Sequence, residues 1–159
     1  MILRIAGSNS RNGTNRSQCQ APLIFAALIH IATVHHKSPA WIGIQLEQLR
    51  RLSLPYRTYA SLEGIDSQEG FDVVVPSLGN HSGKLNLLAN SVLEVADRDD
   101  WLLFLDGDAF PIVDVVPMLN EVLGRSPLVA IRRDENLADR QPHPSFCATT
   151  AGFLSLIHI

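Results

Sequence analysis

The feature that most constrains the fold is an alternation of short apolar runs with segments of helical periodicity. Five runs have the apolar or β-branched composition of buried strands, and helix-spaced apolar residues separate most of them. The expected strands are His30–Val34, Tyr56–Ala60, Phe71–Val75, Trp101–Leu105 and Leu128–Ile131. Strands that alternate with helices predict an α/β fold, with a mostly parallel, Rossmann-like sheet and helices on both of its faces.

Three segments carry apolar residues at helical spacing. The first is expected to begin at Ser38–Pro39, with Ser as N-cap and Pro at the first helical position. The second follows an expected loop, Leu78–Lys84, and the third continues past Pro117. The three apolar faces are Ile42, Leu46, Leu49 and Leu52; Leu85, Leu88, Val92 and Val95; and Ile112, Val116, Leu119 and Leu123.

The two ends of the chain differ from its middle. Gly7–Gln20 has almost no apolar content and is expected to be disordered, so residues 1–29 are interpreted as a poorly structured or partly spurious extension. The last six residues, LSLIHI, resemble the translation of a transposase-derived adaptor found in metagenomic reading frames. Residues 154–159 are interpreted as this tail, and a genuine terminal strand is the alternative. The folded domain is then expected over 30–153, truncated at Phe153.

Composition excludes several classes of function. The formal net charge is -3, so no positive field gathers a polyanion, and nucleic acid is not an expected partner. Cys19 and Cys147 lie far apart, which argues against a disulfide framework and a thiolate zinc site and favours a reducing, cytoplasmic location. The longest apolar run, Ala21–Val34, is too short to cross a bilayer.

The chemistry is carried by Asp106-Gly107-Asp108, which directly follows the most apolar strand. In open parallel sheets, ligands bind beyond the carboxyl ends of the strands. Two carboxylates there are costly unless they are solvated or paired with a cation. Mg²⁺ and Mn²⁺ prefer oxygen ligands and bind one or two carboxylates together with water and phosphate oxygens. Gly107 would let backbone and ligand approach closely, whereas the plainer reading is a polar turn after a core strand.

The segments LLFLDGDAFP and NHSGKLNLLANSVLEVA resemble the nucleotide-sugar glycosyltransferases of GT-A type, family 2-like, over about His30–Phe153. The resemblance implies a GT-A-like fold and hexosyltransferase-like activity. It implies a UDP-, GDP- or dTDP-linked donor and an acceptor that is a saccharide, a lipid or a protein. It also implies that Asp108 coordinates Mn²⁺ or Mg²⁺ on the diphosphate and that Asp106 lies near the ribose and the metal. The metal would offset charge on the departing nucleoside diphosphate.

The same resemblance extends to neighbouring strand ends. The family's first strand end lines the base, and the segment before its second helix faces the nucleotide. The implied nucleotide-sugar contacts are Thr33, His35, His81, Lys84, Asn86, Asp106 and Gly107. Plainer readings stand beside them, since His35 and His36 suit an exposed loop, and Lys84 and Asn86 suit a solvated helix surface. A zinc site at the two histidines is disfavoured because adjacent side chains diverge.

Two features depart from the family pattern. Many members carry an acidic residue closely after the second strand that reads the base, whereas here Ala60–Leu62 intervene before Glu63. The general base of inverting members comes from a later segment, so no catalytic base is assigned. The charged stretch Arg132–Pro144 is interpreted either as an acceptor-side loop or as a solvated connector.

Two other functions compete with sugar transfer. A haloacid-dehalogenase-like phosphatase also places Asp-X-Asp after an apolar strand, but it usually has Thr or Val where this chain has Phe110, and it sets the motif near the start of its domain. A non-catalytic nucleotide-binding module is the second alternative. A lipid or polysaccharide acceptor would bring the chain to the inner face of a membrane, and the sequence does not indicate an oligomeric state.

Overall fold

The computed structural model describes residues 28–66, 69–133 and 141–157. The predicted disorder of Gly7–Gln20, residues 134–140 of the predicted connector and the last two residues lie outside this part of the chain. The strands are β1 (Ile29–His36), β2 (Tyr56–Glu63), β3 (Val73–Val75), β4 (Trp101–Asp106), β5 (Leu128–Arg133) and β6 (Gln141–Thr150). The helices are α1 (Ile42–Leu49), α2 (His81–Leu93), α3 (Val116–Leu123) and α4 (Ala151–Ile157).

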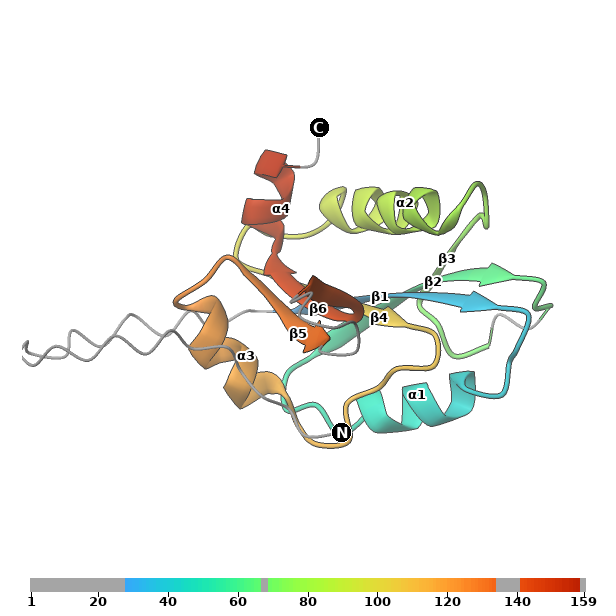
Figure 1. Cartoon of the computed structure of the whole chain (residues 1–159), viewed down its shortest axis with the longest axis horizontal. Coiled ribbons are helices and arrows are strands. Elements are labelled where there is room, and N and C mark those ends of the chain that lie inside the picture. Colours follow the sequence, from blue (N-terminus) through green and yellow to red (C-terminus); the bar gives the residue numbers. More distant parts are fainter. Residues whose placement is uncertain (1–27, 67–68, 134–140, 158–159) are drawn as a thin grey trace, which may run out of the picture.

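The strands form one six-stranded sheet in the order β3-β2-β1-β4-β6-β5. The four strands β1 to β4 pair in parallel, and β6 runs antiparallel between β4 and β5. Helices α2 and α4 lie above the sheet and α1 and α3 lie below it (Figure 1). The predicted α/β fold, with a mostly parallel sheet and helices on both faces, is confirmed.

Two hydrophobic clusters hold these layers together, because alternate residues of the central strands point to opposite faces of the sheet. Ile31 and Leu103 face one way and pack with Leu119 of α3. Ala32 and Leu102 face the other way and pack with Leu88 of α2. The central strands β1 and β4 therefore contribute to both clusters, which explains why β4 is nearly continuously apolar.

None of the three predicted helices begins where the sequence predicts. α1 and α3 begin later, and α2 begins earlier. α1 begins at Ile42 rather than at Ser38–Pro39. Only the first part of the predicted loop Leu78–Lys84 is a loop, because α2 begins at His81. The Asn80 side chain caps this helix by accepting a hydrogen bond from the Gly83 amide at 2.9 Å. α3 begins at Val116, so Ile112, 73% exposed, is not part of its apolar face.

Three interpretations that concern strands are also corrected. β3 is a three-residue edge strand rather than a buried one. The end of the predicted connector Arg132–Pro144 belongs to β6, whose prolines precede Phe146, the residue at which β6 begins to pair with β4. The alternative of a terminal strand in the last six residues is wrong, since α4 runs to Ile157 and buries Leu154. The adaptor origin of that tail stays a prediction.

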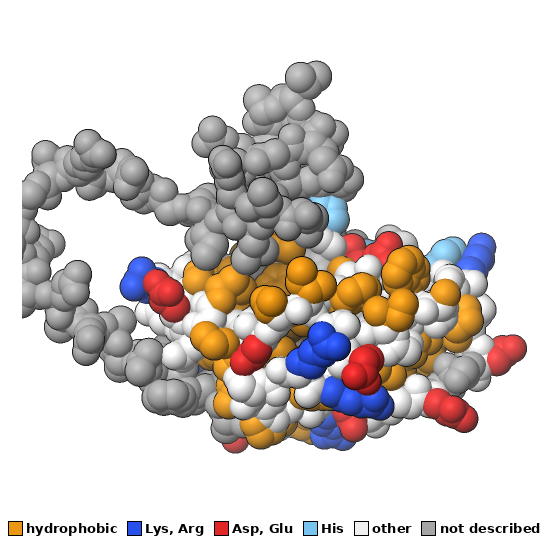
Figure 2. Space-filling view, turned by 90° about the horizontal axis from the view of Figure 1, so that it is seen from below, with side chains coloured by type: hydrophobic (Ala, Val, Ile, Leu, Met, Phe, Trp, Pro, Cys, Tyr) orange, Lys and Arg blue, Asp and Glu red, His pale blue; other side chains and the backbone are white. Residues whose placement is uncertain are grey.

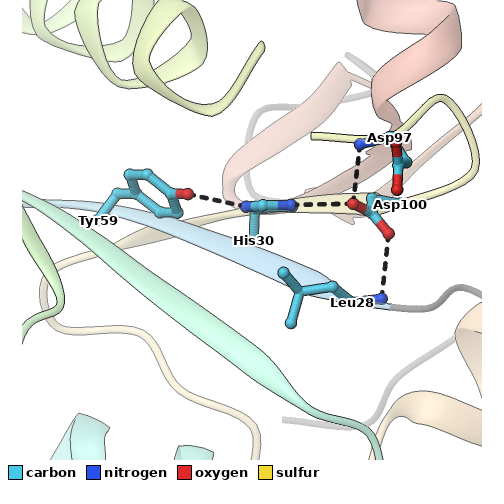
Figure 3. A network of polar contacts seen from close by, with 5 residues as sticks. All are labelled: Leu28, His30, Tyr59, Asp97 and Asp100. Carbon is cyan, nitrogen blue, oxygen red and sulfur yellow. Dashed lines mark hydrogen bonds and ion pairs between the residues drawn. The ribbon is translucent and has the colours of Figure 1, made fainter. Parts of the chain in front are cut away.

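A buried polar network ties together the amino ends of the central strands (Figure 3). His30 lies between the Tyr59 hydroxyl, 3.0 Å from Nδ1, and the Asp100 carboxylate, 3.3 Å from Nε2. Asp100 also accepts hydrogen bonds from the amides of Leu28 and Asp97, at 3.1 and 3.0 Å. Since His30 and Asp100 are almost completely buried, these contacts satisfy groups that water does not reach.

We expect Asp100→Ala to lower the free energy of unfolding by about 2–3 kcal/mol, because it leaves a buried imidazole and two amides without their acceptor. The exposed neighbour Asp99 provides the matched control. Asp99→Ala should change stability by no more than about 0.5 kcal/mol. Urea denaturation measures both; equal small losses would contradict a stabilising role for the network.

Candidate functional site

The carboxyl ends of three adjacent strands meet at one edge of the sheet. In the strand register, Val34 of β1 lies beside Asp106 of β4, and His36 of β1 lies beside Glu63 of β2. α1 and α2 both begin at this edge (Figure 1). Polar side chains from β1, β2, β4 and α2 are therefore brought together from positions far apart in the sequence.

The Asp106-Gly107-Asp108 segment forms a tight turn at the end of β4. The Ala109 amide donates to the Asp106 carbonyl at 2.9 Å, which closes the turn. Gln45, a fully buried residue of α1, donates from its side-chain amide to the carbonyls of Asp106 and Ala109, at 3.0 and 2.7 Å. One glutamine side chain thus holds both ends of the turn that carries the two carboxylates.

Gly107 is required by close packing rather than by a left-handed backbone. A Cβ atom at this position would lie 2.6 Å from the Val34 carbonyl oxygen and 2.7 Å from His35 Nδ1. Such contacts are far inside van der Waals distance, and the first of them involves a backbone atom. The close approach that the structure shows is to the end of β1, and the predicted approach of a ligand to Gly107 stays a prediction.

His35 is held in one orientation by the same glutamine. Its Nε2 lies 3.2 Å from Gln45 Oε1, and both amide hydrogens of Gln45 are used by carbonyls, so the hydrogen-bond pattern assigns the proton to Nε2. Burial lowers the pKa of His35, while the hydrogen bond to Gln45 and the nearby Asp108 act in the opposite direction. His35 is therefore a neutral imidazole, and its unprotonated Nδ1 packs against Gly107.

A pocket with a volume of about 380 Å³ opens above the turn. This volume is near the lower end of the range of about 300–1,000 Å³ that is usual for ligand sites. The lining residues are Val34, His35, His36, Ser38, Trp41, His81, Asp106, Gly107 and Asp108. The pocket therefore combines both predicted metal ligands with three histidines, one hydroxyl and one indole.

The two carboxylates differ in their surroundings. Asp106 is half-buried, and its Oδ1 lies 3.9 Å from Nε2 of His81, the first residue of α2. Asp108 is exposed and also lines the pocket. An anion beside a helix N-terminus is favoured by the helix dipole, and Asp106 and His81 meet in that arrangement.

Lys84 lies beside the pocket but is already paired. Its buried ammonium group contacts the carboxylate of Glu63, which also accepts a hydrogen bond from His36 Nδ1 at 2.8 Å. The hydrogen bond from Lys84 and then that from His36 lower the pKa of Glu63 to about 2. The sequence placed Glu63 beyond the second strand, whereas β2 extends to it, so an acidic residue does stand at this strand end.

Three of the predicted nucleotide contacts, Thr33, Asn86 and the paired Lys84, are absent from the pocket lining. Thr33 is buried inside β1 and is absent from the pocket lining, because β1 continues for two residues beyond its predicted end. Asn86 is exposed more than one helical turn beyond the start of α2 and does not line the pocket either. His35, His81, Asp106, Gly107 and Asp108 do line it together.

Sequence reasoning missed Gln45 and Trp41. Gln45 occupies the inward-facing stripe of α1 between Ile42 and Leu49, and a polar residue in such a stripe is the signal that could have revealed it. Trp41 stands at the N-cap position of α1 without making a side-chain capping bond. An aromatic residue at a position that favours small polar side chains is a comparable signal.

The donor set fits a hard divalent cation that arrives with a substrate. Among residues 28–66, 69–133 and 141–157, no group of three or more acidic, histidine or cysteine side chains is arranged to hold a metal. Mg²⁺ and similar ions commonly use one or two carboxylates and complete their coordination with water and phosphate oxygens. Asp106 and Asp108, at the mouth of an open pocket, match that second pattern.

Solved glycosyltransferase structures resemble this chain. A mannosyltransferase from Pyrobaculum calidifontis, in complex with GDP-Man and Mn²⁺, superposes with a TM-score of 0.58 at 10% identity over 90% of the chain. The apo form of the glycosyltransferase GlyE from Streptococcus pneumoniae superposes with a TM-score of 0.57 at 16% identity over 84% of the chain. Over that length, the chain shares the fold of these solved structures.

The similarity covers only part of those proteins. The chain spans 50% of the mannosyltransferase and 36% of GlyE. No protein-family model matches the sequence, and no curated protein matches it. Within the described part of the chain, no helix is both long enough and apolar enough to span a membrane.

We expect Gly107→Ala to lower the free energy of unfolding by about 1–3 kcal/mol, because the added methyl group forces the turn away from β1. The matched control is Gly43→Ala, since a Cβ there has nothing within 4 Å and lies in α1. This control should leave stability unchanged or raise it by up to about 1 kcal/mol. Urea denaturation of both variants measures the difference; equal stabilities would refute the close packing.

Proposed function

We propose that this chain is the nucleotide-sugar-binding part of a metal-dependent glycosyltransferase. The observation that carries the proposal is the pocket above the Asp106-Gly107-Asp108 turn, at the carboxyl edge of the sheet in a chain that shares the fold of solved glycosyltransferases. Ligands of open parallel sheets bind at this edge. The mannosyltransferase that the fold resembles was solved with a nucleotide sugar and a divalent ion, which supports the same ligand class here.

In this proposal Asp106 and Asp108 hold a Mn²⁺ or Mg²⁺ ion together with the diphosphate of a UDP-, GDP- or dTDP-linked sugar. The ion supplies charge stabilisation to the departing nucleoside diphosphate. Gln45 and Gly107 keep the two carboxylates at the mouth of the pocket. Because the turn is fixed before a ligand arrives, little reorganisation is needed when charge develops.

The neighbouring side chains have distinct proposed tasks. His81, at the start of α2 and 3.9 Å from Asp106, contacts the phosphates. Glu63 remains ionised because Lys84 and His36 stabilise its charge, and we propose that it accepts hydrogen bonds from the base. Lys84 orients Glu63 in this scheme and does not bind phosphate directly.

The acceptor and the catalytic base remain outside the proposal. The chain spans half or less of the solved structures that it resembles, so the acceptor, which is a saccharide, a lipid or a protein, depends on the whole enzyme. Transfer itself is therefore a property to be tested on a complete protein, whereas donor binding is testable on this chain.

We expect GDP or UDP to bind the chain in calorimetric titrations with Mn²⁺ and to bind much more weakly without it. Asp108→Ala should weaken the metal-dependent binding by about 10–100-fold or more, because mutating even a residue that only hydrogen-bonds to a metal ligand costs that much metal affinity. Asp99→Ala removes an exposed carboxylate elsewhere and should leave the affinity unchanged. A folded chain that binds neither nucleotide in any metal condition would contradict the proposal and favour a phosphatase or a non-catalytic module.

A further inference from the structure

One side chain that lines the pocket, Trp41, packs against a second aromatic side chain, Phe110. Trp41 lines the pocket from the start of α1, and Phe110 follows the Asp106-Gly107-Asp108 turn by two residues. Their ring centroids are 6.4 Å apart, and their planes are inclined by 34°. Segments that are 69 positions apart in the sequence (41 and 110) therefore form one aromatic surface beside the carboxylates.

The position of Trp41 lacks a structural explanation. Its side chain is 43% exposed, whereas Trp101, the other tryptophan of the chain, is 1% exposed in the core. Trp41 occupies the N-cap of α1 without a side-chain capping bond, and α1 reaches the core through Ile42 and Leu49. A large aromatic side chain gains stability chiefly by burial, and this one forgoes much of that gain.

Other apolar side chains in the same two segments are also exposed. On the face of the molecule that carries α1 and α3, hydrophobic side chains lie in a band between charged ones (Figure 2). Ile44, Ile112 and Val113 are exposed in the same two segments as the aromatic pair. Trp41 differs from them because it also lines the pocket, together with Asp108 and the Ser38 hydroxyl.

We propose that Trp41 and Phe110 form a stacking surface for the apolar face of a pyranose ring. Aromatic faces carry partial negative charge and attract the C–H groups of a sugar face, whereas its hydroxyl groups need polar partners at the rim. Ser38, His36 and Asp108 line the same pocket and offer such partners. The inference rests on the proposed function, since the ring belongs either to the nucleotide-sugar donor or to a saccharide acceptor.

The test compares ligands with and without a sugar ring on three proteins, the unaltered chain, Trp41→Ala and Trp41→Phe, with Mn²⁺ present. The ligands are GDP, GDP-mannose, UDP, UDP-glucose and, in the presence of each diphosphate, methyl α-mannoside. Calorimetry gives affinities, and acrylamide quenching reports the exposure of Trp41, because buried Trp101 is the other source of tryptophan fluorescence.

We expect Trp41→Ala to weaken nucleotide-sugar binding about five- to tenfold while the affinity for the matching nucleoside diphosphate stays the same. Trp41→Phe retains an aromatic face and should bind nearly as the unaltered chain does. Nucleotide sugars should protect Trp41 from acrylamide, and this protection should be absent in Trp41→Phe. Protection by methyl α-mannoside instead would support the same surface and assign it to the acceptor.

Three results would overturn the inference, and they are distinguishable from failure of the proposed function. Protection of Trp41 by the nucleoside diphosphate alone would assign the surface to the base. Equal weakening of diphosphate and nucleotide-sugar binding in Trp41→Ala would do the same. Metal-dependent nucleotide-sugar binding that Trp41→Ala leaves intact would refute the stacking surface but keep the proposed function, whereas a chain that binds no nucleotide at all fails both.

Discussion

The side chain of Gln45 is the interaction on which the candidate site depends. It is completely buried, and each of its hydrogen-bonding groups has a partner, two carbonyls of the Asp106–Ala109 segment and the Nε2 of His35. A buried amide is costly unless it is satisfied in this way. The same three bonds fix α1, the end of β1 and the turn after β4 with respect to one another, so the carboxylates have a defined position before any ligand binds.

Close packing reinforces this arrangement. Because residue 107 has no side chain, the turn lies directly against the Val34 carbonyl and the His35 ring. Beside the turn, the pocket is therefore bounded by the backbone of Gly107 and by the oriented imidazole of His35. A rigid boundary of this kind suits a site that must hold a small, strongly charged group in one geometry.

The acidic residues at the sheet edge fall into two groups, one paired within the protein with a lysine and one not. Glu63 stays ionised and is paired within the protein with Lys84 and His36, which lower its pKa to about 2. Asp106 and Asp108 have no lysine or arginine partner among the ion pairs of the described residues, where the Asp106 carboxylate pairs with His81 at 3.9 Å. Two carboxylates left in this state beside a pocket attract a cation, whereas Glu63 does not need one.

The parts of the fold and site that the sequence predicts are those carried by local patterns. The apolar run of β4 and the acidic turn after it are adjacent in sequence, so the composition alone places Asp106 and Asp108 at a strand end. The sequence did not predict β6, because it contains Pro142 and Pro144, which are unusual within strands, and because its pairing with β4 is long-range. The sequence did not predict the role of Gln45, because the carbonyl groups that it binds are 61 and 64 residues away. Thr33 was misplaced relative to the pocket because β1 extends beyond Val34, which moves the strand end to His35 and His36.

The central claim, that the turn held by Gln45 binds a divalent ion, is tested most directly by anomalous diffraction at the manganese edge. The crystals would contain this chain with Mn²⁺ and a nucleoside diphosphate. The account predicts an anomalous peak within about 2–2.5 Å of a carboxylate oxygen of Asp108, bridging to the diphosphate. Nucleotide density in the pocket with no peak at Asp106 or Asp108, or with the ion bound elsewhere, would contradict it.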